Sequence, residues 1–95
     1  MTDLIVSLLK EIESDHTVAI QENQYDQSHP LVRAVIYLAN DYLTDDDRHV
    51  HMSVIKKSGF SIYPGEQDRF GWLTGCIQLT KGRIVFGYAS QSVAT

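Results

Sequence analysis

The sequence predicts an α+β fold: a small single domain with two helices packed on one face of an antiparallel β-meander of about four strands. Apolar residues recur at helical spacing in two segments before residue 48, whereas they alternate with polar residues after it. Glycine-containing turns divide this second half into strand-length pieces. A chain of 95 residues, 43% of them hydrophobic, suffices for one core. We therefore expect residues 1–95 to form one domain.

Two amphipathic segments are predicted to be helices. Asp3 can cap a first helix over 4–13, whose apolar side chains fall on one face. The second segment, "SHPLVRAVIYLANDYL", has Pro30 where the first turn of a helix tolerates it. Between them, "HTVAIQEN" predicts a short strand around Val18 and Ile20, with a turn at the letters "EN".

The segment "QLTKGRIVF" predicts a hairpin. A two-residue turn at Lys81 and Gly82 would pair Ile77 with Phe86. The same register would pair Leu79 with Ile84, two residues nearer the turn. This register places the large apolar side chains of both strands on one face. The alternation of apolar and polar residues independently predicts the same face.

The segment "VHMSVIKKSGFSIY" is predicted to be a second hairpin, and its turn has two alternatives. A two-residue turn at Ser58 and Gly59 would pair Val54 with Tyr63. A three-residue turn with Gly59 left-handed would pair Val54 with Ile62 and gather the apolar side chains on one face, so we prefer it. The expected core of the domain is Leu8, Ile12, Val35, Leu38, Met52, Val54, Ile62, Ile77, Leu79, Ile84 and Phe86.

The charges are sorted along the chain. Residues 1–47 hold ten acidic and two basic side chains, whereas residues 48–95 hold two acidic and six basic ones. The simpler explanation is that acidic helices and basic strands attract each other, with their charges otherwise in water. The alternative is that one pole of the molecule meets a charged partner.

The sheet face opposite the core is the candidate binding site. It mixes aromatic, aliphatic and polar side chains, and such a mixture is typical of contact surfaces. If the meander curls or a helix crosses to this side, the same residues would instead form a second core. The candidate binding residues are Trp72, Tyr63, Ile55, Val85, Arg83, Gln78 and His51.

The stretch "DDDRHVHM" raises the question of a metal site. On a strand, His49 and His51 would point the same way with side chains about 7 Å apart, which suits two ligands of one ion. Two ligands do not complete a site, and the sequence contains neither H-E-x-x-H nor a pair of cysteines. We expect no metal and no cofactor.

The sequence offers two weak catalytic constellations. Cys76 could share the outer face with His51, but a strand within a sheet provides no loop for an oxyanion site. Glu66 and Asp68 lie together in a polar loop, where ordinary solvation explains them. We do not expect an enzyme.

The function predicted from these observations is that of a small protein-binding module, such as an inhibitor, an immunity-type protein or another regulatory protein. Its partner would be a foreign protein or a second copy of the chain. The alternative is a nucleic-acid-binding domain, in which Tyr63 and Trp72 stack on bases and the basic half meets phosphates. The N-terminal segment resembles neither a secretion signal nor a membrane span, and the lone Cys76 favours a reducing compartment, so we expect the cytoplasm.

Overall fold

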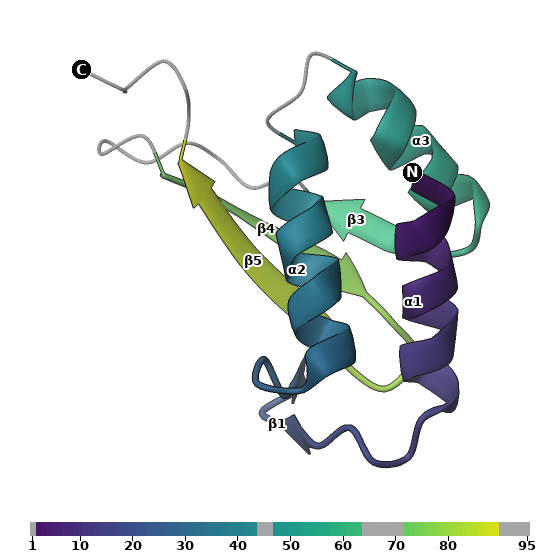
Figure 1. Ribbon diagram of the computed structural model, residues 1–95, viewed down its shortest axis with the longest axis vertical. Coiled ribbons are helices and arrows are strands. Elements are labelled where there is room, and N and C mark those ends of the chain that lie inside the picture. Colours follow the sequence, from purple (N-terminus) through teal and green to yellow (C-terminus); the bar gives the residue numbers. More distant parts are fainter. Residues whose placement is uncertain (1, 44–46, 64–71, 90–95) are drawn as a thin grey trace.

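The computed structural model describes residues 2–43, 47–63 and 72–89, which form three helices and a five-stranded mixed sheet (Figure 1). The α+β class is therefore confirmed. The sheet order is β1-β2-β5-β4-β3, in which β2 and β5 run parallel and the other neighbours are antiparallel. The elements in chain order are α1 (Thr2–Ser14), β1 (Ile20–Gln21), β2 (Gln24–Tyr25), α2 (Pro30–Leu43), α3 (Arg48–Lys57), β3 (Ser61–Tyr63), β4 (Trp72–Gln78) and β5 (Arg83–Ala89).

The core lies between the helices and one face of the sheet. All three helices stand on the same side of the strands (Figure 1). Ile62, Ile77 and Ile84 form a buried row across β3, β4 and β5. Among the residues predicted for the core, the following are buried: Ile12, Val35, Ile62, Ile77, Leu79, Ile84 and Phe86. The other four, Leu8, Leu38, Met52 and Val54, are partly buried and pack against this cluster.

The first hairpin of the sheet is formed by β1 and β2. Glu22 and Asn23 have φ values of 54° and 65°, so the turn predicted at the letters "EN" is present with both central residues left-handed. This conformation matches the twist of two-residue hairpins. The strand β2, which the sequence did not predict, joins the hairpin to the main sheet by pairing Gln24 with Arg83 in parallel.

The segment predicted as the first strand of the second hairpin is instead the helix α3. Its alternating apolar residues suggested a strand, but Val50 is 61% exposed in the helix. Ile55, which is predicted for the outer sheet face, is 2% exposed and belongs to the core. The helix arises because it turns Ile55 inward beside partly buried Met52, three residues earlier and thus on the same helical face.

Gly59 ends α3. The left-handed conformation predicted for this residue is confirmed, with φ 99°, but it caps a helix and does not form a hairpin turn. The amide of Gly59 donates to the carbonyl of Lys56 at 3.1 Å, and that of Phe60 donates to the carbonyl of Ile55 at 3.4 Å. Both Ile55 and Phe60 are buried, which completes the apolar contact of a Schellman motif.

Replacing Gly59 by alanine is therefore expected to lower the free energy of unfolding by about 1–2 kcal/mol, because an L side chain is strained in the left-handed conformation. Lys57→Ala, at an exposed helical position, is the control. Chemical denaturation of both variants measures the difference. Equal stabilities of the two variants would contradict this explanation of the cap.

The hairpin of β4 and β5 has a register two residues away from the predicted one. Ile77 pairs with Ile84, and Gly75 pairs with Phe86. A connection of four residues, 79–82, replaces the predicted two-residue turn, and the amide of Leu79 donates to the carbonyl of Gly82 at 2.8 Å. The predicted pairs are thus wrong, but a shift by an even number of residues leaves each side chain on its face. The predicted core face is therefore confirmed.

Candidate functional site

The candidate site is the sheet face that points away from the helices, which we call the open face. Its first feature is a polar row that runs in register across all five strands. Four of these side chains are exposed and that of Gln24 is half-buried. The row consists of Gln21, Gln24, Arg83, Gln78 and Ser61.

The second feature of the open face is a less polar row formed by Tyr63, Cys76 and Val85, which pair across β3, β4 and β5. Tyr63 is 59% exposed, whereas the side chains of Cys76 and Val85 are half-buried. Burial raises the pKa of the Cys76 thiol, and the nearby charge of Arg83 opposes this effect. The thiol is therefore protonated at neutral pH, which makes it a poor nucleophile.

The open face gathers four of the seven side chains that the sequence assigned to it: Tyr63, Val85, Arg83 and Gln78. Ile55 lies in the core and His51 lies on α3, so neither belongs to this face. Both errors follow from the mistaken strand, because the alternation of side chains on a strand does not apply to a helix. The backbone of Trp72 pairs with Ala89 in the sheet, and its side chain lies outside the described part of the molecule.

His51 connects two helices. Its ring stacks on that of Tyr42 in α2, with centroids 4.8 Å apart and planes inclined by 21°. His49 is exposed two positions earlier, and residues two apart on a helix do not share a face. The arrangement predicted for the two histidines on a strand is therefore wrong. Asp45 and Asp46 of the same motif, like the Glu66–Asp68 pair, lie outside the described residues.

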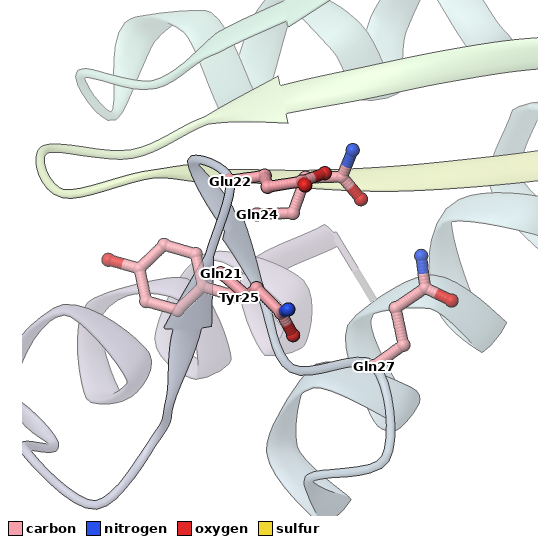
Figure 2. A pocket seen from close by; sticks show the side chains of 5 residues that line it. All are labelled: Gln21, Glu22, Gln24, Tyr25 and Gln27. Atoms are coloured by element: carbon pink, nitrogen blue, oxygen red, sulfur yellow. The ribbon is translucent and has the colours of Figure 1, made fainter.

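Two hollows open where the β1–β2 hairpin joins the main sheet. The first contains one carboxylate and no basic residue in its lining, which consists of Gln21, Glu22, Gln24, Tyr25 and Gln27. Figure 2 shows Glu22 and Gln24 extending from the hairpin in one direction and the ring of Tyr25 in the other. The second contains two basic residues and no carboxylate, and is lined by Asn23, Gln78, Thr80, Lys81, Gly82 and Arg83.

Sequence reasoning missed the second hollow because it depends on the parallel pairing of β2 with β5, which brings Asn23 beside the β4–β5 connection. The two paired residues, Gln24 and Arg83, are separated by most of the chain, and the pairing leaves no local pattern. The first hollow had a local signal in the glutamine-rich run "QENQYDQ", which supplies all five of its lining residues.

The chain matches no protein-family model, and comparisons with curated proteins and with solved structures found no match. Within residues 2–43, 47–63 and 72–89, no helix has the length and apolar character that crossing a membrane requires.

Proposed function

We propose that this chain is a non-enzymatic protein-binding module, such as an inhibitor, an immunity-type protein or another regulatory protein, and that it binds through the open face. The observation that carries the proposal is the exposed ring of Tyr63 beside the half-buried side chains of Cys76 and Val85. Tyrosine and arginine are enriched where proteins contact each other, and an exposed ring next to a partly buried apolar row suits an anchor.

The polar row supports the same function. Gln24, Gln78 and Arg83 lie beside the Tyr63 row and can hydrogen-bond to a partner at the margin of an apolar contact. All three helices stand on the other side of the sheet, so among the described elements no helix covers this face (Figure 1). The partner is a foreign protein or a second copy of the chain, and a cytoplasmic location suits the unpaired thiol on this face.

Nucleic-acid binding is the alternative, favoured by the presence of Arg83 and the exposed ring of Tyr63 on one face. Titration with a labelled single-stranded oligonucleotide at low and at moderate salt separates the two functions. We expect no saturable binding, because the described part of the polar row and the hollow beside it offer two cations, Arg83 and Lys81, too few for the consecutive phosphates of a strand. Saturable binding that weakens steeply with salt would support the nucleic-acid function and overturn our proposal.

A further inference from the structure

The hollow beside the β4–β5 connection, which we call the basic hollow, has the features of a small ligand site. Its volume is about 250 Å³, and its six lining residues include Lys81 and Arg83 but no carboxylate. It lies between that connection and the β1–β2 turn, to which Asn23 belongs. The neighbouring hollow contains Glu22 and lacks a basic residue, so the two hollows differ in the charge they would accept.

Hydrogen bonds fix the backbone around the basic hollow. The amide of Arg83 donates to the carbonyl of Asn23 at 2.8 Å, which joins the two turns. The side-chain nitrogen of Gln78 donates to the carbonyl of Leu79 at 3.0 Å and to that of Gly82 at 3.1 Å. A Cβ atom at Gly82 would come within 3.0 Å of the Asn23 carbonyl oxygen, so only glycine fits comfortably. The two cations are therefore attached to a backbone held in place before any ligand arrives.

The cations of the basic hollow have no partner in the described part of the chain. Lys81 and Arg83 are exposed, and neither forms an ion pair with a described carboxylate. The carboxylate of Glu13 accepts a hydrogen bond from the Thr80 hydroxyl at 2.7 Å. The Glu13 carboxylate therefore already accepts a hydrogen bond from the β4–β5 connection, and Glu13 does not line the hollow.

We infer that the basic hollow binds the carboxylate of an acidic side chain presented by the protein partner. The guanidinium of Arg83 can donate two parallel hydrogen bonds to a carboxylate, and the ammonium of Lys81 adds a second positive charge. Arg83 also belongs to the polar row, so the hollow is continuous with the open face. This inference rests on the proposed function and adds the chemistry of the partner: an acidic group next to an apolar contact.

The test is an NMR titration of the isotope-labelled full chain with a blocked tri-glutamate peptide. A blocked tri-glutamine peptide and inorganic phosphate serve as comparison ligands. We expect saturable shifts of the Asn23, Lys81, Gly82 and Arg83 amides with tri-glutamate and no saturable shifts with tri-glutamine. The variant Lys81→Gln/Arg83→Gln should bind tri-glutamate at least tenfold more weakly.

The matched control is Lys56→Gln/Lys57→Gln, which removes the same charge from exposed lysines at the end of α3. Equal weakening in both double variants would show general charge attraction and overturn the site, as would the absence of saturable shifts. Phosphate binding at least tenfold tighter than tri-glutamate would overturn the assignment to a carboxylate. Tyr63→Ser keeps both cations of the basic hollow. The titration therefore tests the hollow, whereas the effect of Tyr63→Ser on partner binding tests the open face, and either result can be negative without deciding the other.

Discussion

Replacing Gly75 by alanine is expected to lower the free energy of unfolding by about 1–3 kcal/mol, because there is no room for a side chain at this position. A Cβ atom there would overlap the ring of Phe86, at 2.5 Å from its Cε2 atom, and would come within 3.0 Å of the Tyr63 carbonyl oxygen. Gly75 and Phe86 are paired residues on adjacent strands, so the ring lies over the glycine. Chemical denaturation of the variant measures the loss.

A double-mutant cycle shows whether the Phe86 ring causes that loss. Phe86→Ala alone should cost about 3–5 kcal/mol, since the ring is buried in the core. Gly75→Ala should then cost much less in the Phe86→Ala background than in the wild type, because the overlapping ring is gone. Equal costs in both backgrounds would contradict the observed register, and would favour the sequence-based pairing of Ile77 with Phe86.

Replacing Tyr63 by serine is expected to weaken partner binding by about 2 kcal/mol, or roughly thirtyfold, because exposed aromatic anchors carry much of the energy of such contacts. The free energy of unfolding should change far less, since the side chain is 59% exposed. Isothermal titration with the identified partner measures the first quantity, and chemical denaturation measures the second. A variant that is strongly destabilised but binds normally once folded would show that Tyr63 serves the fold.

The sheet face in the core was predictable because it depends only on alternation. The shift of the β4–β5 hairpin by two residues changed every pair but left Ile77, Ile84 and Phe86 on the buried face. The true register was not predictable from the turn letters. It is accompanied by a hydrogen bond from the amide of Arg83, at the start of β5, to the carbonyl of Asn23, which belongs to a different part of the chain.

The helix α3 was not predictable from its apolar pattern. Val50, Met52 and Val54 alternate as on a strand, and only the burial of Ile55 selects the helical face. Gly59 was a local indication of where this helix ends, because a left-handed glycine commonly follows the last turn of a helix as well as forming hairpin turns.

This single error accounts for the two residues wrongly assigned to the candidate site, His51 and Ile55. Tyr63 and Val85 lie on true strands, and their assignment to the open face was correct. Trp72 also lies on a true strand, and its part in binding stays a prediction.

The most direct test of binding through the open face compares two tyrosines. Tyr37 is 75% exposed on α2, on the helical side of the molecule, so Tyr37→Ser is matched to Tyr63→Ser in chemistry and differs in location. Quantitative pull-downs from the source cell, with wild type and both variants as baits, measure partners. Sedimentation of the three proteins measures self-association. We predict that an interaction made by the wild type is lost in Tyr63→Ser and retained in Tyr37→Ser. Loss in both variants, or retention in Tyr63→Ser, would contradict binding through the open face.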